Sequence, residues 1–472
     1  MKQTFSFLIY FGLTLQLIAQ SPQEVYSKSL QEVFDRIEKE YAVKLIYEQK
    51  VVDKRKVDYA DWRFFSDIET TLAYVLMPLE LRFINKGNNQ FEIKSWEYFR
   101  KPYAEGNKHL QKLLAQFNTL ELWEVRKTEL KNNMLSKLGL VPIPKRNDLN
   151  PIRSNFRKLD GYNAENIALE VLPGVYLSGT LYSPAKPAKI NPAMLSPHGH
   201  FYNNIDKSIP NERGRYREDQ QKRCAMLAKM GVYVFSYDMF AWGESNYQVP
   251  LKDHRSGLAL TMQTWNAMRV VDFLLSMKEV DPERIGITGA SGGGTQTFIA
   301  AALDERITLS VPTVMVSAHF FGGCPCESGL PIHQLDDGLQ TNNAEISALF
   351  APKPQLIISN GNDWTQTVPQ SEYPYLQKIY TFYNATDKIR NAHFQQEGHD
   401  YGISKRIAMY EFVSTQFQLN TKLVKDKAGN WDESKIVVEP ATALYVFGEK
   451  NPFPAHAVMG LDGVRKAFKV LK

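Results

Sequence analysis

A serine flanked by small residues stands where one apolar run ends and another begins. The segment Gly289-Ala290-Ser291-Gly292-Gly293 follows the β-branched run 285–288 and precedes the apolar run 298–303. The first run predicts a buried strand and the second a helix. A Gly-x-Ser-x-Gly turn between strand and helix is typical of a nucleophile held at a sharp bend. Alternatively, the segment is only a glycine-rich turn that packs a strand on a helix.

A serine hydroxyl needs a base to take its proton, and a carboxylate commonly orients that base. In a strand–turn–helix context, the expected chain order is serine, acid, histidine. Asp363 follows the predicted strand 355–359, and His399 lies on a later glycine-containing loop. The sequence therefore predicts Ser291, Asp363 and His399 as a catalytic set. Two alternatives stay open: Glu327 as the acid and His393 as the base.

An ester or amide hydrolase also needs donors for the oxyanion that forms on the substrate. The amide of Gly292 comes directly after the candidate nucleophile, at the predicted start of a helix. The segment His198-Gly199-His200 follows an early predicted strand, 193–195, and its glycine lets the backbone approach a substrate. We expect the amides of Gly292 and His200 to form the oxyanion hole.

Strands and helices alternate through the centre of the chain, which predicts an α/β fold. Predicted strands at 232–235, 311–316 and 355–359 alternate with predicted helices at 218–229 and 257–277. Apolar strands of this kind indicate a mostly parallel sheet flanked by helices on both faces. A hairpin, 166–172 with 175–182, is expected to start the sheet with antiparallel strands. The site should lie beyond the carboxyl ends of the parallel strands.

The first residues have the pattern of a secretory signal peptide over residues 1–20. One lysine precedes an apolar run at 5–19, which ends at Gln20-Ser21-Pro22. A membrane anchor is the alternative, but the run is short for a span. No other segment is long and apolar enough to cross a bilayer. The mature chain is therefore expected to be periplasmic or secreted, without a membrane span.

Residues 21–97 are predicted to form a small α+β module. Capping boxes at 29–32 and 66–69 open helices with apolar faces, and a hairpin is expected from 79–84 and 90–94. The arrangement resembles the short N-terminal domain of secretins and TonB-linked receptors, which implies a protein partner. The alternative is an ordinary accessory domain.

Three further segments complete the predicted domain organisation. Residues 98–150 read as a helical lead-in, and residues 151–420 as the catalytic domain. Residues 421–472 read as an extension packed on that domain. Within the extension, 436–438 and 444–447 are expected to form strands.

Charge and cysteine content exclude several functions. A formal charge of +5 over 472 residues, without a basic block, gives no indication of nucleic-acid binding. The three cysteines are Cys224, Cys324 and Cys326, too few for a disulfide scaffold. Cys324-Pro325-Cys326 lacks a second ligand pair for zinc, so no metal or cofactor is predicted. Packed thiols, or one bridge to Cys224, remain open.

Residues 151–420 resemble α/β-hydrolase-fold esterases, and above all secreted bacterial proteins of the acetyl xylan esterase type. The segments that carry the resemblance occur in the expected order: 198–200, 237–245, 289–293, 323–327, 362–365 and 397–400. The resemblance implies hydrolysis of carboxylic, in particular acetyl, esters on a carbohydrate. Glucuronoyl esterases are related, but they carry an arginine after the nucleophile. Gly292 at that position argues against their substrate.

Two other functional classes stay open. Serine peptidases of the prolyl oligopeptidase type share the triad, although the N-terminal region is too short for their propeller. A non-catalytic binding or signalling protein is the second alternative. Aromatic residues in the loops near the predicted site suit a sugar substrate, although they equally suit loop packing.

Overall fold

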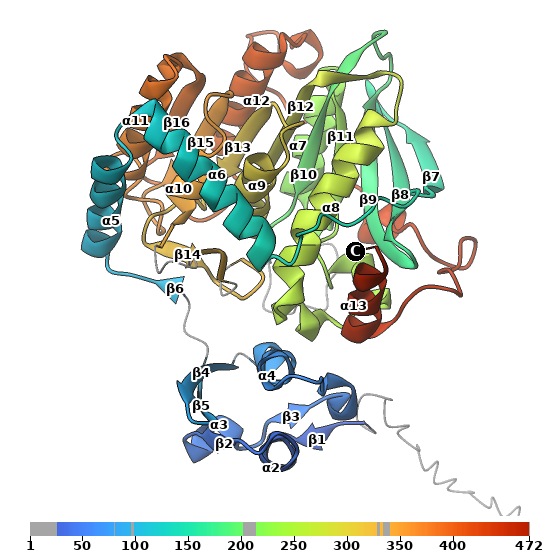
Figure 1. Cartoon of the computed structure of the whole chain (residues 1–472). Helices are drawn as coiled ribbons and strands as arrows, with labels where there is room; N and C mark the ends of the chain where they lie inside the picture. The colour runs from blue at the N-terminus through green and yellow to red at the C-terminus, as the bar shows by residue number, and fades with distance from the viewer. Residues whose placement is uncertain are drawn as a thin grey trace, which may run out of the picture. The chain divides into compact units, whose positions relative to one another are not determined.

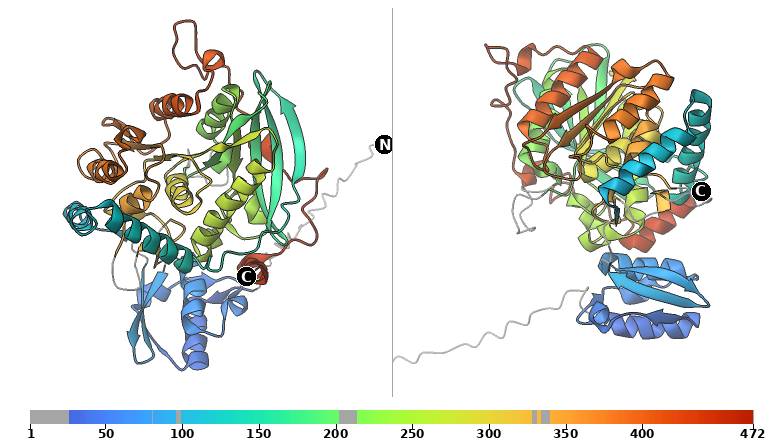
Figure 2. Two further views of the ribbon diagram at one scale, coloured as in Figure 1. Left: turned by 45° about the horizontal axis from the view of Figure 1, so that its top comes forward. Right: turned by 90° about the vertical axis from the view of Figure 1, so that its left-hand side faces the viewer.

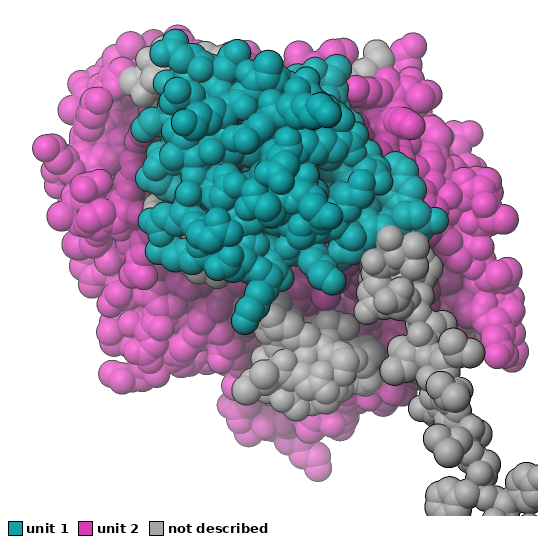
Figure 3. Space-filling view, turned by 90° about the horizontal axis from the view of Figure 1, so that it is seen from below, with its two compact units in different colours: residues 1–95 teal, residues 96–472 magenta. Residues whose placement is uncertain are grey.

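A large twisted sheet organises residues 96–472, the second of two units into which the chain divides at Ser95 (Figures 1 and 3). This computed structural model describes residues 26–79, 81–95, 99–201, 214–327, 331–333 and 340–471. The predicted signal peptide at 1–20 lies outside the described residues. Among the described residues, nine strands form the sheet in the order β16-β15-β13-β12-β10-β11-β9-β8-β7.

The antiparallel end of the sheet is the predicted hairpin. Strand β8 (Tyr162–Leu172) pairs with β9 (Val175–Pro184) across Pro173-Gly174, and β7 (Ile152–Lys158) extends the sheet beyond β8. Gly174 has φ +74°, a conformation that glycine adopts without strain. The predicted hairpin is confirmed.

The other strands run parallel to one another, as the α/β pattern predicts. Their bounds are β10 Asn191–Pro197, β11 Tyr233–Tyr237, β12 Val280–Ala290, β13 Leu309–Thr313, β15 Gln355–Asn360 and β16 Ile389–Phe394. Pairing is in register from Gly286↔Leu309 to Ala290↔Thr313 in the β12–β13 pair. The carboxyl ends of these strands therefore meet at one edge, where their loops can form a site.

Helices cover both faces of this sheet (Figure 2). Helices α7 (Glu218–Lys229) and α12 (Ile403–Phe417) pack together on one face. Helices α8 (Leu258–Leu275) and α9 (Gly292–Leu303) pack together on the other. The remaining helices of this unit are α5 Tyr103–Gln116, α6 Leu120–Lys137, α10 Asn343–Ala348, α11 Glu372–Phe382 and α13 Gly460–Val470. The α/β-hydrolase fold expected from the sequence is confirmed.

Short elements shape the loops around the sheet. Strand β6 (Phe99–Arg100) pairs antiparallel with β14 (Phe320–Gly322), outside the main sheet. Among the described residues of this unit, 3₁₀ turns occupy Gly214–Tyr216, Gly243–Tyr247 (η5), Leu251–Arg255 (η6), Pro331–His333, Thr386–Lys388, Lys422–Val424 and Ala441–Leu444; the first unit has its own at Ala60–Arg63 and Met77–Leu79. The turn η6 contains the buried His254.

The first unit has its own apolar core and a small α+β fold. It contains β1 Lys28–Ser29, α2 Leu30–Tyr41, β2 Lys44–Ile46, α3 Gln49–Val52, β3 Lys56–Val57, α4 Ile68–Leu76, β4 Leu81–Gly87 and β5 Gln90–Ser95. The apolar faces of α2 and α4 are buried in one cluster of Leu30, Val33, Phe34, Ile37, Leu72, Val75 and Leu76, against which the partly buried Tyr41 packs. The predicted hairpin of β4 and β5 is confirmed, and it turns at Asn88-Asn89, both with positive φ.

One of the two predicted capping boxes is confirmed and the other is displaced. The Ser29 hydroxyl accepts a hydrogen bond from Glu32 N, and the Glu32 carboxylate accepts one from Ser29 N. Before α4, however, the Asp67 carboxylate accepts the bond from Thr70 N at 2.7 Å. The cap is therefore Asp67 and not Ser66, because an aspartate one residue nearer the helix reaches the free amides.

The strands predicted at 436–438 and 444–447 are wrong. Among the described residues, neither segment pairs with a strand; instead, the backbone donors of Val446 and Phe447 bond the buried Glu244 carboxylate at 2.8–3.0 Å. Val446 and Phe447 are buried in a cluster with Ala168 and Tyr176, whereas Val437 and Val438 are exposed. The β-branched residues of these segments therefore do not indicate membership of a sheet.

Candidate active site

Ser291 occupies a strained turn between β12 and α9. Its backbone has φ +56° and ψ −124°, a combination that side-chain-bearing residues rarely adopt. The residue is 8% exposed. Strain of this kind persists only where the surroundings enforce it, and it is typical of functional positions.

Glycines on either side of Ser291 are required by close packing. A Cβ at Gly289 would lie 2.5 Å from the carbonyl oxygen of Pro197, and one at Gly293 would lie 2.6 Å from the same atom. Both positions therefore accept only hydrogen, because the end of β10 presses against the turn. The same steric requirement explains why a Gly-x-Ser-x-Gly pattern predicts a nucleophile turn.

His399 and Asp363 form a directed pair. His399 Nδ1 lies 2.7 Å from Asp363 Oδ2. The other carboxylate oxygen, Oδ1, accepts hydrogen bonds from both the amide and the hydroxyl of Thr365 at 2.6 Å. Asp363 is thus held from both oxygens on the loop after β15, and its side chain is only 3% exposed. The contact orients the imidazole and leaves its Nε2 directed elsewhere.

Phe201 connects the histidine with the serine turn. Its ring centroid lies 5.4 Å from that of His399. At the serine turn, a Cβ added to Gly199 would lie 3.0 Å from both Phe201 Cε2 and Ser291 Cβ. Gly199 thus lies close to both Phe201 and Ser291, and Phe201 in turn lies against His399.

A second histidine–carboxylate pair adjoins the residue after the serine. His200 Nδ1 lies 3.0 Å from Glu327 Oε1, and Glu327 Oε2 accepts a 2.6 Å bond from Gly323 N. Burial raises the pKa of the Glu327 carboxyl, but His200, the Gly323 amide and His399 together lower it below its usual value. A Cβ at Gly292 would lie 2.7 Å from His200 Cε1 and 2.8 Å from Glu327 Oε1.

This packing bears on the residues expected from the sequence. The 198–200 loop lies against the serine turn, where an amide donor was expected. Glu327, the alternative acid, pairs with His200, whereas Asp363 pairs with His399. His393, the alternative base, lies within β16 and bonds the Ser359 hydroxyl and the Gln395 side chain.

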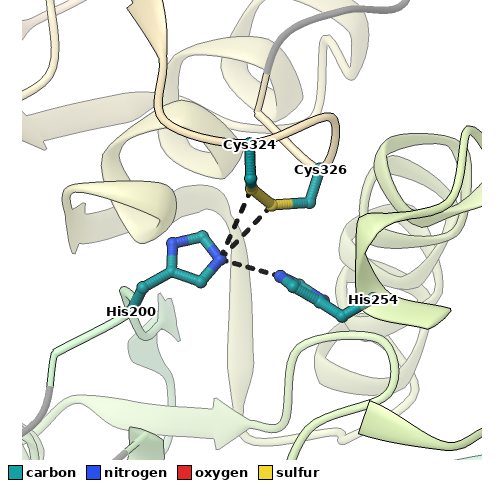
Figure 4. Close-up of side chains that lie close together, drawn as sticks. All are labelled: His200, His254, Cys324 and Cys326. Carbon is teal, nitrogen blue, oxygen red and sulfur yellow. Dashed lines mark hydrogen bonds between the residues drawn. A yellow bond between two sulfur atoms is a disulfide. The ribbon is translucent and has the colours of Figure 1, made fainter. Parts of the chain in front are cut away.

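The sequence did not predict that three further side chains lie next to His200. His254, on η6, places its Nε2 2.7 Å from His200 Nε2 (Figure 4). Cys324 and Cys326, on the loop after β14, form a disulfide beside the same nitrogen. The bridge to Cys224 considered from the sequence is wrong, because Cys224 is a buried free thiol in α7. His254 carries no signal in the sequence, since its neighbours come from distant loops.

The segment 237–245 is structural. Buried Arg215 donates to Asp238 at 2.8 Å and to Glu244 at 2.8 Å. Gly243, with φ +53°, leaves no space for a side chain, because a Cβ would lie 2.2 Å from the Asp238 carboxylate. Asp238 therefore belongs to a structural turn.

Comparisons with known proteins agree with this fold. The family model for fungal glucuronyl esterases matches residues 241–321. A 4-O-methyl-glucuronoyl methylesterase of Cerrena unicolor is 33% identical over 100 residues, which cover 21% of this chain and 20% of that protein. One from Phanerochaete carnosa is 24% identical over 207 residues, or 36% and 50% of the two chains. The chain thus spans half or less of the length of these two relatives.

One solved structure matches almost the whole chain. Methylesterase BT1017 is 39% identical, with a TM-score of 0.71, over 95% of this chain and 98% of that one. The match is longer than residues 96–472 and therefore extends into the first unit. Identity at this level over nearly the full length of both proteins identifies a common family. The chain belongs to the esterase family that includes methylesterase BT1017.

Proposed function

We propose that the chain is a serine esterase that hydrolyses the methyl ester of a uronic acid within a polysaccharide or oligosaccharide. The observations that carry the proposal are the 2.7 Å contact between His399 Nδ1 and Asp363 Oδ2 and the strained backbone at Ser291. The names of the relatives support the ester class: BT1017 is a methylesterase, and the fungal relatives are glucuronoyl methylesterases.

The proposed reaction proceeds through an acyl-enzyme. Ser291 Oγ attacks the ester carbonyl carbon, and its proton passes to His399 Nε2. The amides of Gly292 and His200 stabilise the oxyanion. The bond between the acyl carbon and the methoxy oxygen then breaks, and His399 donates its proton to that oxygen, which leaves as methanol. Water, deprotonated by His399, attacks the acyl-enzyme and releases the uronate and free Ser291.

This assignment makes the sugar the acyl group and methanol the leaving group. In an acetyl ester, the substrate that the sequence resemblance implies, acetate is the acyl group and the sugar leaves. Aromatic side chains next to His399 favour a sugar close to the reacting carbonyl. The Trp364 ring lies 4.5 Å from His399, and Phe320 stacks on Trp364 at 4.0 Å. Flat apolar faces of this kind suit the C–H faces of a pyranose.

Gly292 distinguishes this site from one that places an arginine after the nucleophile. The His200 ring and the Glu327 carboxylate already occupy the space that a side chain at 292 would need. Any recognition of the substrate carboxyl group in this protein therefore uses other residues, and the sugar specificity is expected to differ from that of the fungal enzymes.

We also assign the protein to the periplasm or the extracellular space, on the basis of the signal-peptide pattern at 1–20. Among the described residues, no helix has the length and apolarity needed to cross a bilayer. The likeness of residues 21–97 to the secretin and TonB-linked module, with its protein partner, stays a prediction.

The test measures methanol and acetate separately. Purified full-length chain is given methyl-esterified oligouronides and, in parallel, acetylated xylo-oligosaccharides. Methanol release that Ser291→Ala abolishes supports the proposal, whereas acetate release alone assigns the acetyl reaction instead. Cleavage of proline-containing peptide amides would indicate a peptidase. If no substrate is turned over and a serine-reactive fluorophosphonate does not label Ser291, the protein is a non-catalytic binding protein.

A further inference from the structure

We propose that His200, His254, Cys324 and Cys326 form a zinc-binding site when the two cysteines are reduced. Figure 4 shows the four side chains converging from three separate loops. Their ligand atoms all lie within 4.8 Å of one another. Two imidazole nitrogens and two sulfurs are a donor set that Zn²⁺ binds in tetrahedral structural sites.

The Nε2 atoms of His200 and His254 lie next to each other, and each directs a lone pair at the other. His254 Nδ1 lies 2.5 Å from the carbonyl oxygen of Phe240, which can only accept, so Nδ1 carries the hydrogen. His200 Nδ1 lies 3.0 Å from Glu327 Oε1, a carboxylate oxygen that can only accept, so a hydrogen on Nδ1 is the favoured tautomer although this contact lacks the geometry of a hydrogen bond. Both Nε2 atoms are then acceptors, yet they are 2.7 Å apart. A cation between them removes this conflict.

The two sulfurs distinguish a metal from a shared proton. Cys326 Sγ lies 3.3 Å and Cys324 Sγ 3.8 Å from His200 Nε2. For zinc bonds of about 2.3 Å to sulfur and about 2.0 Å to nitrogen, tetrahedral geometry separates each sulfur from each nitrogen by about 3.5 Å. A proton could satisfy only the nitrogens. Zinc engages all four atoms, provided that the nitrogens move apart by a few tenths of an ångström and the sulfurs separate.

Charge and surroundings also suit a bound zinc ion. Cys324, Cys326 and His254 are at most 5% exposed. Two thiolates neutralise Zn²⁺, so the occupied site carries no net charge into this buried position. Glu327 and the Phe240 carbonyl hold the histidines as outer partners typically hold zinc ligands. Gln263 in α8 donates to the Cys326 carbonyl at 2.9 Å and fixes the cysteine loop.

The metal-bound state and the disulfide exclude each other, because both use the same sulfurs. A dithiol reductant opens the disulfide: it supplies two electrons and two protons, and itself becomes a disulfide. Zinc then binds the two thiols and displaces two protons. The loop that carries Cys324 and Cys326 therefore has two alternative states: in one the disulfide joins the two cysteines to each other, and in the other zinc links them to His200 and His254.

Metal uptake tests the proposal without reference to ester hydrolysis. Full-length chain is reduced with dithiothreitol, freed of reductant under argon, and titrated with Zn²⁺ against a chromophoric chelator. We expect one zinc per chain by elemental mass spectrometry and loss of two titratable thiols on binding. The oxidised chain should bind zinc at least about 10²-fold more weakly, because two ligands are missing.

Matched variants locate the ion. Cys326→Ser and His254→Gln should each lower the zinc affinity of the reduced chain by about 10²-fold or more, whereas Cys224→Ser, a buried thiol outside the cluster, should leave it unchanged. Co²⁺ in the reduced wild type should show tetrahedral d–d bands and sulfur-to-metal charge transfer, which tests the site even if a variant misfolds. Zinc uptake equal in wild type and Cys326→Ser, or cobalt spectra without sulfur ligation, would show that the proposal is wrong.

Discussion

One carboxylate oxygen of Asp363 contacts the His399 ring, and the other accepts two hydrogen bonds from Thr365. His399 Nδ1 lies 2.7 Å from Oδ2, and Oδ1 accepts two bonds of 2.6 Å from Thr365. The carboxylate cannot rotate without losing several bonds at once. It can therefore fix both the tautomer and the direction of the imidazole, which is the role of the acid in a serine hydrolase.

Replacing the acid should separate the two candidate carboxylates. We expect Asp363→Ala to lower kcat by about 10⁴-fold, because the imidazole loses its tautomer and orientation. Glu327→Ala should cost much less, since Glu327 pairs with His200. Steady-state hydrolysis of an aryl ester measures both variants. A larger loss in Glu327→Ala than in Asp363→Ala would reassign the acid to Glu327.

Filling the space at Gly292 should damage catalysis more than stability. In Gly292→Ala, the new methyl group meets the His200 ring and the Glu327 carboxylate at 2.7–2.8 Å and displaces the amide at 292. We expect kcat to fall about 10²-fold, as for loss of one oxyanion donor. The matched control is Gly398→Ala, where an added Cβ meets no atom within 4 Å.

The readouts for this pair are kcat and the midpoint of urea unfolding. Gly398→Ala should match the wild type in both. Wild-type kcat in Gly292→Ala would show that the amide at 292 has no part in the reaction.

Glu244 should be essential to the stability of residues 96–472. Its buried carboxylate pairs with Arg215 and accepts bonds from two amides of the C-terminal stretch. Glu244→Gln leaves Arg215 partly unneutralised, and we expect a loss of about 3 kcal/mol in the free energy of unfolding. Glu165→Gln is the control, because Glu165 pairs with the 44% exposed Arg153, a contact worth less than about 1 kcal/mol. Equal unfolding midpoints for the two variants would contradict this role of Glu244.

His333 should make the protein sensitive to mild acid. Burial lowers the pKa of His333 to about 4, although its bond to Asn343 acts in the opposite direction. In the unfolded chain a histidine takes up its proton near pH 6.5. Between these values the unfolded state binds more protons, so stability falls as the pH drops, by about 1.4 kcal/mol per unit from this residue.

Denaturant unfolding at pH 7 and pH 5 measures this effect. The stability difference between wild type and His333→Gln should shrink on acidification by about 2 kcal/mol, because the variant has no proton to gain at this position. His393→Gln, at a half-buried histidine of the sheet edge, is the matched control. A constant difference between wild type and His333→Gln would contradict the prediction.

Local rules predicted most of the fold. Helix α7 has the bounds expected from its apolar spacing, and the β8–β9 hairpin turns at the expected Pro173-Gly174. The sharp turn at Ser291 could be predicted from Gly289 and Gly293, because the packing leaves no room for a side chain at either position. These features depend on neighbours in the chain, and the sequence displays such neighbours directly.

Features that depend on distant partners escaped prediction. His254 and the Cys324–Cys326 pair meet His200 only because loops after three different elements converge. The segment 444–447 has strand-forming residues, but its amides bond a carboxylate about 200 residues earlier. Neither relationship leaves a periodicity or a spacing in the sequence, so only the folded arrangement reveals it.

The bonding of the last fifty residues fixes where the gene can be shortened. Buried Arg406 pairs with Glu433, and Arg157 bonds Glu439, in addition to the amides that bind Glu244. A truncation after residue 420 would keep Ser291, Asp363 and His399 but would leave these charged side chains without their partners. Such a truncation is expected to yield insoluble material. An affinity tag at the C-terminus would select chains that retain these last fifty residues.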